Sequence, residues 1–152
     1  MAACYRLFRR KYSPADATGA YLAGGRWNPK GVHMLYAFST LSLACLEILV
    51  HIKEPRFPFD YEWVKIEIPT GLIDRPFRPR GSDDDDSRRQ LGSEWIRAGR
   101  RPVIKTPSVI IPIEKNFLIN PEHRAFRDLS FSEPEPFRFD PRLLKLGPMP
   151  GR

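Results

Sequence analysis

Three residues of different chemical type lie close together in the sequence: Arg26, Tyr36 and Glu47, at spacings of ten and eleven residues. They belong to the stretch GGRWNPKGVHMLYAFSTLSLACLEILVH, which predicts a glycine-rich loop, a short strand and a buried helix. A loop, a strand and a helix that meet at one corner can direct all three side chains into one pocket. A cation, an aromatic ring and a carboxylate could there bind and act on an anionic ligand that contains a planar ring.

Arg26 follows two glycines and precedes a turn at Asn28-Pro29. Glycine lets the backbone approach a ligand closely, so a guanidinium beside exposed N–H groups could hold a diphosphate. The simpler interpretation of Arg26 alone is a surface arginine in a salt bridge.

Glu47 falls in a helix predicted from Leu41 to about Lys53, which is apolar on nearly all sides and therefore buried. A buried carboxylate must meet a cation, a hydroxyl or a ligand. The alternative is solvent exposure along the helix's narrow remaining stripe, which consists of Thr40, Ala44, Glu47, His51 and Glu54. His51, one turn after Glu47, is either a second ligand contact or the end of that stripe.

Tyr36 and Ser108 each have an ordinary interpretation. Tyr36 lies on a predicted strand, where it can be a core aromatic or stack on a planar ring. Ser108 follows Pro107 in another predicted strand, and no base is attached to it that would make it a nucleophile. The sequence contains no GxSxG, Walker, HExxH or Cys/His motif.

Strands outnumber helices in the rest of the chain. Alternation and turn residues predict strands over residues 4–12, 32–38, 62–69, 103–113 and 116–119, and a last edge strand in FSEPEPFRFDPRLL. Arg6 falls on the opposite face of the first strand from Tyr5 and Leu7. A short helix is expected in SRRQLGSEWIRAG, capped near Asp86 or Ser87. Most connections are too short for parallel crossovers, so we expect a single-domain α+β fold with a mostly antiparallel sheet.

Two segments are expected to lie outside the packed α+β fold. Residues 75–90 are rich in proline and charge, including the aspartate run at 83–86, and predict a mobile surface loop. Four adjacent carboxylates suggest a metal site, but a solvated charge run explains them better. The tail, residues 146–152, predicts disorder.

Composition limits the function classes. A chain of 152 residues favours one domain, and 28% charged residues with no long apolar run exclude a membrane protein. The net charge of +7 favours anionic partners, although no nucleic-acid-binding motif accompanies it. The N-terminus resembles no signal peptide, and Cys4 and Cys45 fit free buried thiols. We therefore expect a cytoplasmic protein.

Five motifs occur in order along the chain: GGRWNPKG, LYAF, LACLEILVH, TPSVIIP and NFLINPEH. Together they resemble the RES domain, a family named for an arginine, a glutamate and a serine. Those positions correspond here to Arg26, Glu47 and Ser108. The resemblance extends from Tyr5-Arg6 to FRFDPRL, so it covers nearly the whole chain as a single RES domain.

RES proteins are toxins of bacterial type II toxin–antitoxin modules, with a fold similar to ADP-ribosyltransferase toxins such as diphtheria toxin. The resemblance implies that this chain cleaves NAD at the nicotinamide–ribose bond, which depletes NAD and arrests growth. It also implies an Xre-like antitoxin that blocks the active site and supplies any DNA contact. A homo-oligomer or a hetero-oligomeric toxin–antitoxin complex would follow. NAD is then a substrate, and no metal is expected.

The resemblance also assigns roles to residues. The expected catalytic set is Glu47, Arg26, Tyr36 and Ser108. The expected NAD-binding set is Arg6, Arg26, Asn28, Tyr36 and His51. Arg6 and Arg26 would bind the phosphates, and Tyr36 would stack on nicotinamide. Glu47 would be the catalytic carboxylate, oriented by Ser108 unless Ser108 orients the ribose instead.

The residue chemistry agrees with this resemblance. Breaking the nicotinamide–ribose bond generates an oxocarbenium-like ribose, which a neighbouring carboxylate stabilises. Three features depart from the family pattern: the aspartate run, Leu7 in place of an aromatic residue, and VIKTPS before the serine position. Transfer of ADP-ribose to a protein stays open beside hydrolysis. Two further functions fit the same residues: a ribonuclease with Glu47 and His51 as acid and base, and a non-catalytic nucleotide-binding module.

Overall fold

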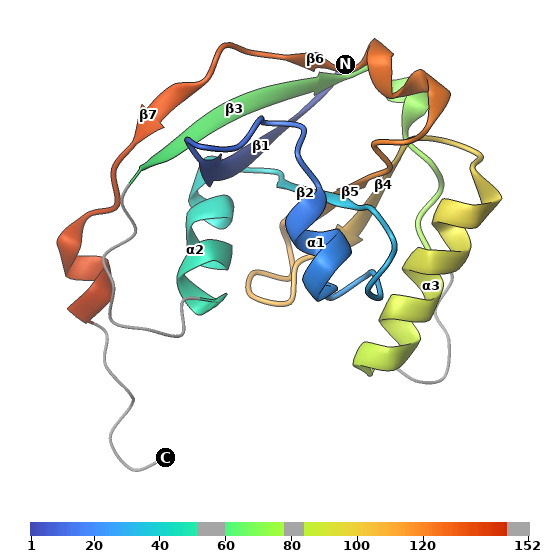
Figure 1. Cartoon of the computed structure of the whole chain (residues 1–152), viewed down its shortest axis with the longest axis horizontal. Coiled ribbons are helices and arrows are strands. Elements are labelled where there is room, and N and C mark those ends of the chain that lie inside the picture. The colour runs from blue at the N-terminus through green and yellow to red at the C-terminus, as the bar shows by residue number, and fades with distance from the viewer. Residues whose placement is uncertain (52–59, 78–83, 146–152) are drawn as a thin grey trace.

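The computed structural model describes residues 1–51, 60–77 and 84–145. Its centre is a seven-stranded sheet with the order β4-β5-β2-β1-β3-β6, in which β7 also pairs with β3 (Figure 1). The strands are β1 (Ala2–Arg9), β2 (Leu35–Phe38), β3 (Tyr61–Ile68), β4 (Val103–Pro107), β5 (Lys115–Ile119), β6 (Ser130–Phe131) and β7 (Glu135–Phe137). Every pairing between these strands is antiparallel. The expected α+β fold with a mostly antiparallel sheet is confirmed.

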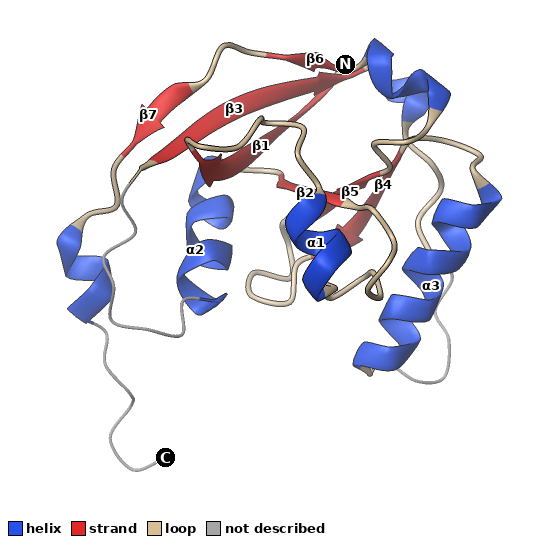
Figure 2. Ribbon diagram, viewed as in Figure 1, coloured by secondary structure: helices blue, strands red, loops and turns tan. Residues whose placement is uncertain are grey.

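Three α-helices accompany the sheet in the described part of the chain (Figure 2). They are α1 (Thr18–Ala23), α2 (Leu41–His51) and α3 (Asp85–Ala98). Short 3-10 helices span Thr70–Leu72, Arg124–Asp128 and Pro141–Lys145. In Figure 1, α2 and α3 lie toward opposite ends of the sheet.

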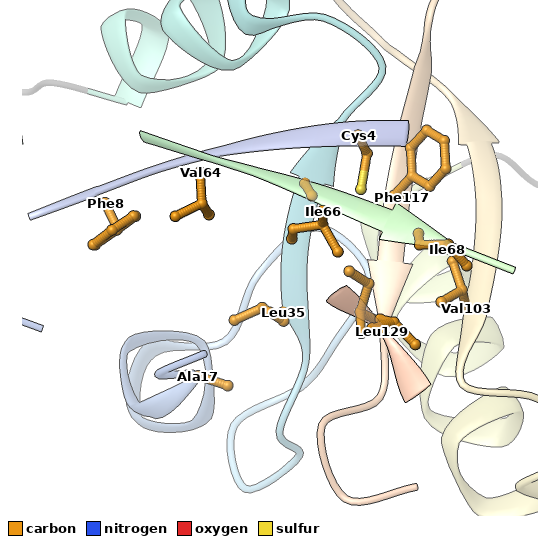
Figure 3. Close-up of a cluster of buried hydrophobic side chains, with 12 residues drawn as sticks. Cys4, Phe8, Ala17, Leu35, Val64, Ile66, Ile68, Val103, Phe117 and Leu129 are labelled. Atoms are coloured by element: carbon orange, nitrogen blue, oxygen red, sulfur yellow. The ribbon is translucent and has the colours of Figure 1, made fainter. Parts of the chain in front are cut away.

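The two faces of the sheet bury different side chains, because residues alternate along each strand. On β2, Leu35 and Ala37 point to one face, and Tyr36 and Phe38 point to the other. We call these the Leu35 face and the Tyr36 face. The Leu35 face carries the main apolar core shown in Figure 3, which includes Cys4, Phe8, Val64, Ile66, Ile68, Val103, Phe117 and Leu129.

The Tyr36 face is covered at both ends by a helix. At one end Trp95 of α3 packs with Trp27, Ile104 and Leu118. At the other end Ala44 of α2 packs in a second cluster, whose other members include Leu7, Phe38, Trp63 and Phe139. The middle of this face, between the two apolar clusters, is therefore where a site can be built.

Arg6 lies on the Leu35 face, where β1 and β2 separate, and bonds to backbone carbonyls there. The two strands share a single Cα pairing, Tyr5 with Phe38. Beyond it, the Arg6 guanidinium donates to the carbonyl oxygens of Pro14, Tyr36 and Asp16 at 2.9, 3.0 and 3.0 Å. Burial lowers the pKa of Arg6 to about 10, so it stays protonated at neutral pH. Arg6 thus replaces missing backbone hydrogen bonds.

Several expected boundaries shift. The strand expected over residues 103–113 ends at Pro107, and the strand expected over 32–38 begins only at Leu35. Helix α1 lies between β1 and the two glycines before Arg26, where no helix or strand was expected from the sequence. The expected helix ends at His51 in the described residues, because residues 52–53 lie outside them.

The prediction of a mobile loop over residues 75–90 is wrong for its last part. Helix α3 begins at Asp85, and the Asp84 carboxylate caps it by accepting the Ser87 N–H at 2.8 Å. Asp85 and Asp86 occupy the first turn, where a helix dipole favours acidic side chains. Residues 78–83 and the tail at 146–152 lie outside the described residues.

We expect Asp84→Ala to lower the free energy of unfolding by about 1 kcal/mol, because the helix loses its N-cap. Urea titration followed by circular dichroism measures this. Asp86→Ala removes an exposed pair with Arg89 (2.6 Å) and serves as the control. Its expected cost is about 0.5 kcal/mol or less. Equal losses in the two variants would contradict a capping role for Asp84.

Candidate active site

Glu47 is buried on the sheet side of α2. Thr40 precedes helix α2 and caps it: its hydroxyl accepts the Leu43 N–H at 3.0 Å and donates to the Glu114 carboxylate at 2.6 Å. The helix positions Glu47 on the same buried side as Leu43 and Ala44. Glu47 is only 8% exposed, so the solvent-exposed alternative does not apply.

The charge of Glu47 is only partly compensated. Burial raises the pKa of the Glu47 carboxyl, while His51 and then Arg26 lower it. The nearest ion-pair contact is His51 Nε2 at 3.7 Å from Glu47 Oε2, and the His51 side chain is 68% exposed. His51 therefore lies at the outer edge of the site.

Arg26 lies within electrostatic range of both Glu47 and Tyr36. Burial raises the pKa of each of these residues, and the Arg26 charge partly opposes that rise. It is half-buried, and no salt bridge joins it to an acidic residue in the described part of the chain. Within the described residues, Arg26 is therefore not the salt-bridged surface arginine of the simpler interpretation. The Arg26 charge also lowers the pKa of Asp85 at the start of α3. We group Arg26, Tyr36 and Glu47 under the name site cluster.

The Tyr36 hydroxyl ties the Arg26 loop to β2. It donates to Asn28 Oδ1 at 2.6 Å and accepts the Trp27 N–H at 3.1 Å. Burial raises the pKa of Tyr36, so the phenol stays neutral and keeps its proton for Asn28. With the hydroxyl engaged in this way, the ring of Tyr36 is what a ligand can use.

Asn28 is completely buried and holds the loop from inside. Its Nδ2 lies 2.9, 3.1 and 3.0 Å from the carbonyl oxygens of Ala20, Pro29 and Val32. A Cβ at Gly25 would lie 2.7 Å from both Asn28 Oδ1 and the Tyr36 hydroxyl, so this position needs glycine. From the sequence, Asn28 was expected to be a turn former and an NAD contact, and this buried hydrogen-bonding role was not predicted.

Ser108 shapes the loop that follows β4. Its hydroxyl accepts the N–H groups of Ile110 and Ile111, each at 3.1 Å, and its own N–H donates to the Glu114 carbonyl at 2.9 Å. Through the bond from Thr40 to Glu114, the loop is fixed to the start of α2. Ser108 is buried, and its hydroxyl is engaged by these two backbone N–H groups.

The Arg6 guanidinium contacts the Tyr36 backbone carbonyl from the Leu35 face, on the opposite side of the sheet from the Tyr36 side chain. Arg6 pairs with Val64, whose side chain belongs to the core of the Leu35 face. Its three nitrogens contact backbone carbonyls there. The expected phosphate-binding pair is therefore divided between the two faces of the sheet, with Arg26 alone beside Glu47.

A separate cavity of about 390 Å³ lies between residues 74–77 and α3. Its buried carboxylate, Asp74, accepts the Trp95 indole N–H at 3.0 Å and lies 3.4 Å from Arg100 Nε. Because Asp74 already has these partners, it resembles a structural carboxylate more than a reacting one.

The described residues contain no group of three or more His, Cys, Asp or Glu side chains placed to hold a metal ion. Within the same residues, no helix is both long and apolar enough to cross a membrane.

The raised pKa of Glu47 has a consequence for stability. The folded protein binds the Glu47 proton more tightly than the unfolded chain does. The stability that Glu47 contributes is therefore complete below its unfolded pKa and is lost as pH rises through the folded pKa. We expect Glu47→Gln to unfold at a higher temperature than wild type at neutral pH, with the difference shrinking toward about pH 4. Thermal unfolding over a pH series measures this, and a variant less stable at pH 7 would contradict it.

The fold is an α+β fold with an antiparallel sheet, and its helix α2 carries a buried glutamate within electrostatic range of Arg26. The chain belongs to the RES domain family, whose model matches residues 3–140. The resemblance seen in the motifs is thereby confirmed.

Individual relatives cover almost the whole chain. "Toxin Res" of Yersinia enterocolitica is 37% identical over 148 residues, which cover 91% of this chain and 97% of the relative. "Prs ADP-ribosylating toxin" of Sphingobium sp. is 35% identical over 147 residues, which cover 90% and 91%.

A chain in the crystal structure of the M. tuberculosis MbcT–MbcA toxin–antitoxin complex has a similar fold. The TM-score is 0.70, and the match covers 95% of this chain and 87% of that chain. At 13% identity, this similarity concerns the fold alone.

Proposed function

We propose that this chain is the toxin of a toxin–antitoxin system and that it cleaves NAD at the nicotinamide–ribose bond. The observation that carries the proposal is Glu47, a buried carboxylate beside Arg26 and Tyr36 in a chain of the RES family. The proposal extends the family assignment to a specific reaction.

The reaction needs little beyond these groups. The bond between nicotinamide N1 and ribose C1′ breaks, its electron pair stays on nitrogen, and the cationic ring leaves as neutral nicotinamide. Ionised Glu47 stabilises the positive charge that develops at C1′. Water then adds to C1′ and releases a proton, which gives ADP-ribose. Because the leaving group becomes neutral on departure, no strong acid has to protonate it.

Arg26 and Tyr36 act on substrate position. The Arg26 guanidinium holds the diphosphate, which fixes C1′ next to Glu47. The Tyr36 ring packs against nicotinamide, since its hydroxyl is bound to Asn28. His51, exposed and 3.7 Å from Glu47, contacts substrate at the outer edge.

Three further residues keep the site in shape. We assign to Asn28 the positioning of the loop that carries Arg26, because its side chain is fully buried and its hydrogen bonds join that loop to Ala20 and Tyr36. Ser108 orders the loop that is attached to α2 and thereby positions Glu47. Arg6 joins β2 to residues 14–16 and leaves the diphosphate to Arg26.

Transfer of ADP-ribose to a protein is the second candidate. The same C1′ cation would be captured by a protein side chain instead of water. One relative at 35% identity carries the name "Prs ADP-ribosylating toxin", which favours this outcome over ribonuclease activity. The site cluster serves both reactions, and only the acceptor differs.

The partner follows from the same proposal. An Xre-like antitoxin would cover the site cluster in a cytoplasmic hetero-oligomeric complex and would make any DNA contact. The fold shared with a chain of a toxin–antitoxin complex supports an antitoxin partner.

Induced expression in bacteria tests the function. We expect cellular NAD, measured by enzymatic cycling, to fall before growth stops, while ribosomal RNA stays intact. A protein band labelled from radioactive NAD would indicate transfer. Degraded RNA with unchanged NAD would contradict the proposal and favour a ribonuclease.

A further inference from the structure

On the Tyr36 face, Thr106 and Asn116 each have a buried polar atom with no hydrogen-bond partner among the described residues, as does the Trp27 indole nitrogen. Thr106 of β4 is 2% exposed and Asn116 of β5 is 4% exposed. Thr106 Oγ1 and Asn116 Oδ1 are both enclosed, and neither is bonded to any described residue. The two residues are direct Cα partners across the antiparallel pair, so their side chains lie next to each other. Buried polar groups are nearly always paired, and two adjacent exceptions call for an explanation.

This pair lies beneath the start of the helix that carries Glu47. Asn116 is also the Cα partner of Phe38, the last residue of β2. Just beyond, the Ser39 N–H donates to the Lys115 carbonyl at 2.9 Å, and the Lys115 N–H donates to Ser39 Oγ at 3.1 Å. Helix α2 then begins and buries Glu47 on its sheet side.

Aromatic side chains flank the same place. Tyr36 and Phe38 of β2 share the face of Asn116, and Tyr36 pairs with Leu118, two residues along β5 from Asn116. The surroundings are therefore aromatic and aliphatic, with one patch of uncharged donors and acceptors. They match a planar ring with a single neutral polar substituent better than a phosphate.

We propose that Asn116 and Thr106 recognise the carboxamide of the nicotinamide ring, an inference that rests on the proposed function. A primary carboxamide presents an N–H donor and a carbonyl acceptor in one plane. The Asn116 carboxamide presents the same two groups and can pair with it, and the Thr106 hydroxyl can donate or accept. Binding of substrate would then satisfy atoms that the free protein leaves unpaired.

The test compares NAD with 3-acetylpyridine adenine dinucleotide, in which a methyl group replaces the carboxamide NH2. We expect wild type to prefer NAD in kcat/KM by about 10- to 100-fold, the effect of one hydrogen bond to a buried partner. Asn116→Leu and Thr106→Val should each reduce the preference to about 3-fold or less, by lowering the value for NAD. An unchanged preference in both variants would overturn the proposal.

A buried water held by the two side chains is the structural alternative, and melting temperature distinguishes it. Replacing an unpaired polar group by an apolar one of similar shape leaves stability unchanged or raises it. We therefore expect neither variant to melt below wild type in the absence of ligand. Lower melting temperatures in both variants, with the preference for NAD intact, would assign the pair to the fold instead.

Binding measured without turnover separates this inference from the proposed function. In the Glu47→Gln background, thermal shift with each dinucleotide reports recognition alone. Discrimination there that Asn116→Leu abolishes supports the carboxamide site even if wild type releases no nicotinamide. Normal turnover with no discrimination overturns the carboxamide site only. A protein that neither binds nor cleaves NAD overturns both.

Discussion

Glu47→Gln is expected to lower kcat for nicotinamide release from NAD by a factor on the order of 10³ while the protein stays folded. Glutamine has nearly the same shape but carries no charge to stabilise the C1′ cation. Because Glu47 is 8% exposed and its raised pKa comes mainly from burial, its charge acts with little screening by water. Product formation followed by chromatography measures the loss.

The matched control for this variant is Glu67→Gln, the same chemical change at a half-exposed position on β3 that pairs with Lys65. It should leave kcat unchanged. If Glu47→Gln still releases nicotinamide at a tenth of the wild-type rate, or still arrests growth on expression, the carboxylate assignment is wrong.

Arg26→Ala is expected to raise KM for NAD by about 10- to 100-fold, with a smaller fall in kcat. The guanidinium holds a diphosphate that does not change during the reaction, so its loss weakens ground-state and transition-state binding alike. Arg26 also lowers the pKa of Glu47, so its removal should move the acidic limb of the kcat/KM profile to higher pH. Arg127→Ala, at an exposed position, is the control.

Arg26→Lys separates charge from geometry. Lysine keeps the positive charge beside Glu47 but cannot form two parallel hydrogen bonds to a phosphate. We expect the acidic limb to stay near its wild-type position while KM remains elevated. A fall in kcat with unchanged KM in both Arg26 variants would contradict a diphosphate clamp.

The strands were predictable where burial imposes alternation on the sequence. Val64, Ile66 and Ile68 on β3 are all fully buried, in line with the pattern. Boundaries set by side-chain hydrogen bonds were less predictable. The expected strand through residue 113 stops at Pro107, because the Ser108 hydroxyl accepts two N–H groups and turns the chain.

The start of α3 was also predicted wrongly from the sequence. Four adjacent aspartates indicated a solvated loop, but Asp84 caps a helix and Asp85 pairs with Arg88 one turn on, at 2.8 Å. A local interaction with the following basic residues therefore outweighs the composition of the run.

The site was predictable in its chemistry and less so in its supports. Arg26, Tyr36 and Glu47 were selected from residue type and spacing, and the Arg26 charge acts on both of the others. Asn28 was not recognised as a positioning residue, because its partners Ala20 and Val32 meet only in the folded loop. The signal that was available for Thr106 and Asn116 is a polar residue at an inward position of each strand, in VIKTP and KNFLI.

The most direct test of the account is nicotinamide release from NAD by the purified chain, freed of any antitoxin, with no other protein present. The account predicts that nicotinamide and ADP-ribose form in equal amounts and that both disappear in Glu47→Gln. A folded, partner-free protein that leaves NAD intact would contradict the hydrolysis claim. Release that begins only when a cell extract is added would assign the same site to ADP-ribose transfer.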